Sequence, residues 1–74
     1  MKTMTLNEVE TGKEVLVREI STDDEEMKAF LFSLGCYSGE PVTVVTRKKK
    51  NLVVSIKDGR YNIDKDIADL IEVA

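Results

Sequence analysis

Short runs of alternating apolar and polar residues dominate the chain and predict β-strands. Turn-forming residues separate these runs. A Lys-Lys-Lys-Asn stretch lies between the second and third runs, and Asp58-Gly59 is a two-residue hairpin signal after the third. Because only tight turns join the three central runs, they form a meander. The predicted strands cover residues 14–20, 42–47, 52–57, 60–63 and 70–73.

One stretch has helical periodicity instead and predicts an α-helix that ends at Leu34. Thr22 and Glu25 have the spacing of a capping box at its start. The acidic residues 23–26 complement the helix dipole there. The apolar stripe that we expect to face the core consists of Met27, Leu31 and Leu34.

Two glycines connect this helix to the next strand. Gly35 stands at the C′ position, where a left-handed backbone ends many helices. Gly39 permits a second sharp reversal before the alternation that starts at Val42. We therefore expect both glycines to be structural turn residues.

The pattern favours a mainly β fold in one domain, residues 1–74. A chain of this length buries only about 60% of its unfolded surface, so the core is small. A barrel of about five strands, with the helix over one opening, would remove exposed sheet edges. Asp64 is placed to cap a single helical turn through Ile67-Ala68 before the last strand.

Charge and cysteine content narrow the possible partners. The net charge of −3 argues against nucleic acid, whose binding needs a basic face. The basic run of residues 47–50 fits a solvated hairpin tip better than a phosphate site. No N-terminal run resembles a signal peptide or a membrane anchor, and the single Cys36 cannot form an intrachain disulfide. We therefore expect a cytoplasmic protein.

The residues offer little catalytic or metal-binding chemistry. The chain has no histidine, which removes the commonest general base and transition-metal ligand. Cys36 is expected to pack as a small hydrophobe. The carboxylates fit a helix first turn, a cap and solvent-facing positions, so no acid pair is predicted. We expect no enzymatic activity, no catalytic or metal-binding residues, no cofactor and at most weak association with transition metals.

Residues 34–45, Leu-Gly-Cys-Tyr-Ser-Gly-Glu-Pro-Val-Thr-Val-Val, resemble the Leu-Gly, apolar, x, Pro-Gly segment of the FeoA family. Ser38 stands where that family usually has proline. Flanking pieces occur in family order, namely Leu6, Val9, Gly12, the 15–20 strand and the closing Ile71-Glu72-Val73. The resemblance implies a barrel like that of Src-homology-3 (SH3) domains. It also implies a cytosolic accessory protein of bacterial ferrous iron uptake that binds the GTP-binding permease FeoB.

Four aromatic residues are the candidate partner-binding residues: Phe30, Phe32, Tyr37 and Tyr61. Phe30 and Phe32 flank the apolar stripe of the helix on opposite sides, so one narrow buried face cannot cover both rings. The alternative is that both rings lie flat over the barrel rim. Phe30 also departs from the FeoA family, which usually has a basic residue there.

A second functional hypothesis follows from the same resemblance, because the FeoA domain also occurs in metal-dependent repressors. The chain would then be a stand-alone regulatory domain that binds a transition metal or a peptide segment. An oligonucleotide-binding barrel is less favoured, because no aromatic residue interleaves with the basic run.

Overall fold

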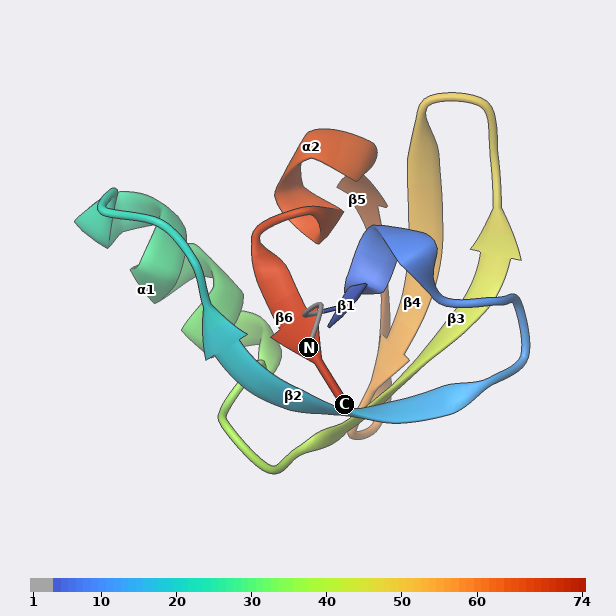
Figure 1. Cartoon of the computed structure of the whole chain (residues 1–74), viewed down its shortest axis with the longest axis horizontal. Helices are drawn as coiled ribbons and strands as arrows, with labels where there is room; N and C mark the ends of the chain where they lie inside the picture. Colours follow the sequence, from blue (N-terminus) through green and yellow to red (C-terminus); the bar gives the residue numbers. More distant parts are fainter. Residues whose placement is uncertain (1–3) are drawn as a thin grey trace.

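The computed structural model describes residues 4–74 and shows a curled antiparallel sheet with one longer helix at its side (Figure 1). The prediction of a mainly β fold is confirmed. In chain order the elements are β1 (Met4–Thr5), the 3-10 helix η1 (Leu6–Glu8), β2 (Glu14–Ile20), α1 (Glu25–Leu34), β3 (Pro41–Arg47), β4 (Asn51–Ile56), β5 (Gly59–Asp64), α2 (Lys65–Ala68) and β6 (Ile71–Val73).

The sheet has six strands in the order β1-β6-β2-β3-β4-β5. The predicted meander is β3, β4 and β5, whose register pairs Val44 with Val54 and Leu52 with Ile63. The sequence predicted about five strands. The additional strand, β1, has only two residues and pairs Met4 with Val73. A strand of that length contains no alternation that a sequence pattern could reveal.

The alternation of inward and outward side chains along the strands determines where the hydrophobic core lies. On β4 the inward residues Leu52, Val54 and Ile56 are each at most 1% exposed. Leu6 from η1 and Ala68 from α2 are fully buried as well, and these two short elements lie together at one end of the curled sheet (Figure 1). The hydrophobic core is therefore enclosed by the strands and by η1 and α2.

Helix α1 packs on the barrel along the predicted stripe. Leu31 is fully buried, and Met27 and Leu34 are half-buried against the core. The helix ends at Leu34 as predicted, and Gly35 follows with φ 104°. The axis of α1 leads away from the barrel beside β2, so most of the other helical positions face solvent (Figure 1).

The start of α1 corrects the predicted capping box. Asp24, and not Thr22, is the N-cap, and its carboxylate accepts hydrogen bonds from the backbone N–H groups of Glu26 (3.0 Å) and Met27 (3.2 Å). The Thr22 hydroxyl instead accepts a hydrogen bond from the N–H of Asp24 at 3.2 Å. A carboxylate adds charge to the cap, which favours the acidic residue at a helix N-terminus.

The β4–β5 turn is one residue earlier than predicted. Ile56 pairs with Gly59, so the two loop residues are Lys57 and Asp58, and Lys57 takes the positive φ of 54°. Gly59 belongs to β5, where a Cβ atom would collide with the side chain of Tyr61. This glycine is therefore needed to make room for a ring and not to form the turn.

Two polar predictions also change. Asp64 precedes α2 at the N-cap position, but its side chain makes no capping hydrogen bond. Arg47 is not part of a free basic tip, because its guanidinium donates to the backbone oxygens of Asn7 and Val9 at 2.7 Å each. It ties β3 to the segment around η1. The exposed tip of the β3–β4 hairpin is left to the lysines of residues 48–50.

Candidate functional site

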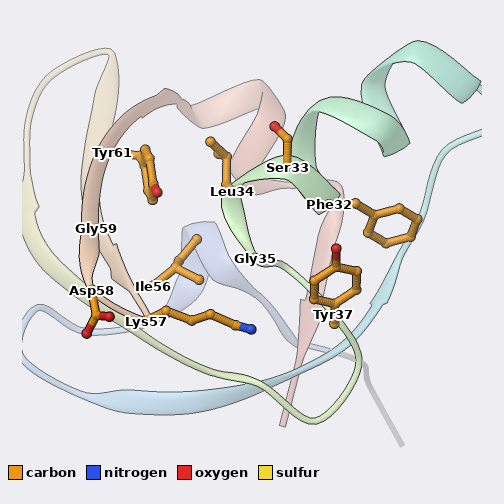
Figure 2. A pocket seen from close by; sticks show the side chains of 10 residues that line it. All are labelled: Phe32, Ser33, Leu34, Gly35, Tyr37, Ile56, Lys57, Asp58, Gly59 and Tyr61. Atoms are coloured by element: carbon orange, nitrogen blue, oxygen red, sulfur yellow. The ribbon is translucent and has the colours of Figure 1, made fainter.

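A cleft of about 490 Å³ lies between the C-terminal end of α1 and the β4–β5 turn (Figure 2). Aromatic side chains stand on both of its sides. We call it the aromatic cleft. Its lining residues are Phe32, Ser33, Leu34, Gly35, Tyr37, Ile56, Lys57, Asp58, Gly59 and Tyr61.

One side of the aromatic cleft is a stacked pair of rings. The ring centroids of Phe32 and Tyr37 are 5.4 Å apart, and the ring planes differ by 12°. Both side chains are exposed in part, Phe32 at 41% and Tyr37 at 48%. The positive φ of Gly35 reverses the chain at the helix end, and the N–H of Tyr37 then donates to the carbonyl of Gly35 at 2.8 Å. The reversal brings Tyr37 back beside the last turn of α1.

Tyr61 stands on the opposite side, with Leu34 and Ile56 between it and the stacked pair (Figure 2). Tyr61 is half-buried and packs against the core. Because Gly35 has no side chain, the end of α1 can lie close to Ile56 and Lys57. A Cβ atom there would lie 3.1 Å from Cγ2 of Ile56 and 3.3 Å from Cδ of Lys57. Gly35 therefore both ends the helix and shapes the cleft.

Lys57 brings positive charge to the aromatic cleft. Its Nζ lies 5.5 Å from the centroid of the Tyr37 ring and 3.8 Å from Oε1 of Glu40. The Lys57 side chain is 51% exposed, and an ion pair that exposed contributes little to stability. The ammonium group therefore remains able to meet a ligand acceptor beside an aromatic face.

The structure gathers three of the four aromatic residues singled out in the sequence. Phe32, Tyr37 and Tyr61 line the aromatic cleft, whereas Phe30 does not. Phe30 is nevertheless 46% exposed. Gly39, the second turn residue, has φ 89° as its predicted reversal requires. Sequence analysis missed Lys57, because only the turn geometry directs its side chain toward Tyr37.

The donor set does not fit a tight transition-metal site. Within residues 4–74 no group of three or more His, Cys, Asp or Glu side chains is close enough to hold a metal ion. Cys36 is only 1% exposed, and burial raises the pKa of its thiol from 9.0 to about 11. A thiol that resists deprotonation is a poor metal ligand. The expected packing of Cys36 in the core is confirmed.

None of the helices within residues 4–74 has the length and hydropathy that a membrane-spanning helix requires.

A small curled antiparallel β-sheet with one longer helix at its side is a fold of the SH3-like class. The family model of the FeoA domain matches residues 4–74, so the chain belongs to the FeoA domain family. This is a family of non-enzymatic accessory domains linked to ferrous iron transport. No curated protein sequence matches the chain.

Solved structures share the fold at low sequence identity. An iron uptake regulatory protein, FeoA, is 22% identical with a TM-score of 0.86, and the match covers 97% of this chain and 96% of that one. FeoA of Stenotrophomonas maltophilia, solved with zinc and described as a prokaryotic SH3-domain protein, is 22% identical with a TM-score of 0.87 over 96% and 89% of the two chains.

A longer protein contains the same fold as one part. A manganese-dependent transcriptional repressor is 22% identical with a TM-score of 0.86, and the match covers 96% of this chain but 40% of the repressor. The SH3-like barrel that the sequence resemblance implied is confirmed by these structures.

Proposed function

We propose that this chain is a cytoplasmic accessory protein of bacterial ferrous iron uptake that binds the cytoplasmic part of the FeoB permease. Membership of a family linked to ferrous iron transport supports the iron uptake system. The aromatic cleft supports binding of a protein segment as the mode of action.

The observation that carries this proposal is the exposure of Phe32 and Tyr37. A domain of 74 residues has few apolar side chains to spare, yet these two rings stack on each other at the surface and not in the core. Aromatic residues are enriched where protein interfaces concentrate their binding energy. A cleft between such rings suits an extended peptide, as in other small barrels that bind peptides.

Lys57 and Tyr61 complete the proposed contact. Tyr61 offers a ring that the core already holds in place, so little side-chain entropy is lost when a peptide packs against it. Lys57 places a cation at the side of the cleft where Tyr37 stands. We therefore expect the bound segment to combine an apolar side chain with a carboxylate or carbonyl acceptor.

Binding to the purified cytoplasmic part of FeoB, measured by biolayer interferometry, tests this function. We expect the Tyr37→Ala variant to bind about tenfold more weakly or worse, in the range of an interface hot spot. Phe30→Ala is the matched control, because Phe30 is a similarly exposed ring outside the aromatic cleft. Undetectable binding of the unmodified protein would refute the function. Equal weakening by both variants would refute the cleft as the contact.

The second candidate function is a stand-alone regulatory domain, and the structural likeness to the manganese-dependent repressor favours it. Of its two possible ligands, a peptide fits the aromatic cleft, whereas a transition metal lacks a suitable donor cluster among residues 4–74. If this chain does not bind FeoB but binds a segment of a metal-dependent repressor, that result would support this alternative.

A further inference from the structure

One edge of β2 is paired along only part of its length. On the β3 side the pairing covers Glu14, Val15 and Leu16, and the last backbone hydrogen bonds are those of Val17. The N–H of Val17 donates to Glu40 at 2.9 Å, and its carbonyl accepts from Gly39 at 2.7 Å. Among the described residues, no strand pairs with this edge beyond that point, over residues 18–20. The other edge of β2 is paired with β6 through Ile20.

This open edge faces a cavity of about 520 Å³ between β2 and α1, which we call the β2–α1 groove. Its apolar part includes Val17 and Cys36, which are almost fully buried. Tyr37 and Ser38 line it beside the loop that follows α1. The remaining lining residues are Arg18, Glu19, Ile20, Glu25, Lys28 and Phe32.

The charges in the β2–α1 groove follow the same order on both walls. Because α1 returns along β2 and its C-terminal loop contacts Val17, the two elements run in opposite directions (Figure 1). From the Tyr37 end outward, β2 presents apolar Val17, then Arg18 and then Glu19. Over the same direction α1 presents apolar Phe32, then Lys28 and then Glu25.

We propose that the β2–α1 groove binds one extended polypeptide segment of a partner protein, which adds to β2 as an antiparallel strand beside residues 18–20. The backbone groups within residues 18–20 that point away from β6 offer the main-chain hydrogen bonds of such an addition; a β-bulge lies between Val17 and Glu19. The order of charges along the two walls determines which side chains the bound segment must carry. A strand antiparallel to β2 matches the charges of both walls when a basic residue near Glu19 and Glu25 is followed by an acidic residue near Arg18 and Lys28. The apolar residue that follows then turns from the edge of β2 toward Phe32, because Gly39 and Glu40 already pair with Val17.

The occupant is a partner segment and not a second copy of this chain. A second copy presents a complementary sequence, since Arg18-Glu19-Ile20 itself reads basic, acidic, apolar. However, α1 and β2 line the same groove, so the occupant must fit between them. A single extended strand meets that condition, whereas a second barrel would bring its own α1 into the same space.

The β2–α1 groove shares Phe32 and Tyr37 with the aromatic cleft, so this inference is tested with residues outside that cleft. The probes are an acetylated, amidated peptide Thr-Lys-Glu-Val-Thr and its charge-exchanged form Thr-Glu-Lys-Val-Thr, titrated to millimolar concentration into isotope-labelled protein. We expect the first peptide to bind about fivefold more tightly, because its charges oppose those of both walls. Backbone amides within residues 18–20 should shift and exchange more slowly with solvent.

A charge reversal sharpens the test. The double variant Arg18→Glu/Lys28→Glu should abolish the preference between the two peptides, because both charged positions of each wall are then acidic. The control, Lys48→Glu/Lys49→Glu, changes the net charge equally at the exposed β3–β4 hairpin and should keep the original preference. For the unmodified protein, failure to bind either peptide, indifference to charge order, or side-chain shifts without amide protection would each overturn the proposal. Concentration-dependent dimerisation with shifts confined to residues 18–20 would also overturn it, in favour of a second copy.

Discussion

The β3–β4–β5 meander and the α1 region, residues 25–40, use their apolar side chains differently. In the meander, Val42, Val44, Leu52, Val54, Ile56 and Ile63 are all buried. In the α1 region only Leu31 and Cys36 are comparably buried, while three aromatic rings, those of Phe30, Phe32 and Tyr37, remain 41% to 48% exposed. The meander therefore contributes more buried side chains to the core than the α1 region does. The α1 region buries only a small part of its apolar surface in the core and leaves the rest exposed.

The largest expected change in the free energy of unfolding tests whether α1 is part of the hydrophobic core. We expect Leu31→Ala and Leu52→Ala each to lower the free energy of unfolding by about 2–5 kcal/mol, because both side chains are fully buried and leave a cavity. Urea denaturation followed by circular dichroism measures this. A loss below about 1 kcal/mol for Leu31→Ala alone would mean that α1 contributes little to the stability of the barrel.

The two glycine turns of the α1 region should differ from each other. We expect Gly39→Val to cost about 1–3 kcal/mol through backbone strain, because its φ is 89°. Gly35→Val should cost more, since its new side chain would also press on Ile56. Melting temperatures of the two variants give the order. Equal melting temperatures would show that the close approach at Gly35 relaxes freely.

The exposed rings should affect binding far more than stability. Tyr37→Ala and Phe30→Ala are each expected to change the free energy of unfolding by less than about 1 kcal/mol, as for exposed positions. Of the two, only Tyr37→Ala should reduce binding to the cytoplasmic part of FeoB. Denaturation and binding must be measured on the same protein preparations. If Tyr37→Ala unfolds the protein as severely as Leu31→Ala, the contrast between the two regions fails.

An effect that is confined to high pH concerns Cys36. Burial disfavours its thiolate in the folded state, so the folded pKa of about 11 lies above the ordinary value of 9.0. The resulting stabilisation is complete below pH 9.0 and is lost as pH rises from there toward 11. Relative to a Cys36→Ala variant, the unmodified protein should therefore lose stability over that range. Urea denaturation at several pH values measures the difference, and a difference independent of pH would contradict this assignment.

The same burial predicts a weak response to metal. We expect calorimetric titration with zinc or ferrous iron to show no stoichiometric submicromolar site, because Cys36 has no second soft ligand and the chain has no histidine. Cys36→Ala is the control and should leave any weak binding unchanged. A tight site that this substitution abolishes would show that the thiol is accessible in solution.

The sequence by itself determined the elements that depend on local periodicity and local backbone geometry. The alternating strands of the meander, the end of α1 at Leu34 and the turns at Gly35 and Gly39 were all predicted correctly. So was the inward stripe of α1, because side chains at helical spacing must share a face. The order of these pieces along the chain was also sufficient to indicate the FeoA family.

Tertiary structure decided what depends on partners distant in sequence. The hairpin turn was misplaced by one residue because a requirement for glycine under the Tyr61 ring looks, in sequence, like a requirement for glycine in the turn. The cap moved to Asp24 because several polar residues near the helix start could each have served. Which residue caps the helix and which residues form the turn depend on contacts with other parts of the chain. A sequence pattern does not contain those contacts.

The candidate sites show the same division. Exposed aromatic residues were foreseen on α1, but only the fold brings Phe32 and Tyr37 opposite Tyr61 and adds Lys57 from a turn. The open edge of β2 has no sequence signal at all. It exists because β3 begins at Pro41 and pairs with only the first part of β2, a register that non-local packing sets. Local physics therefore determined which side chains were available, and the closure of the sheet determined which of them meet.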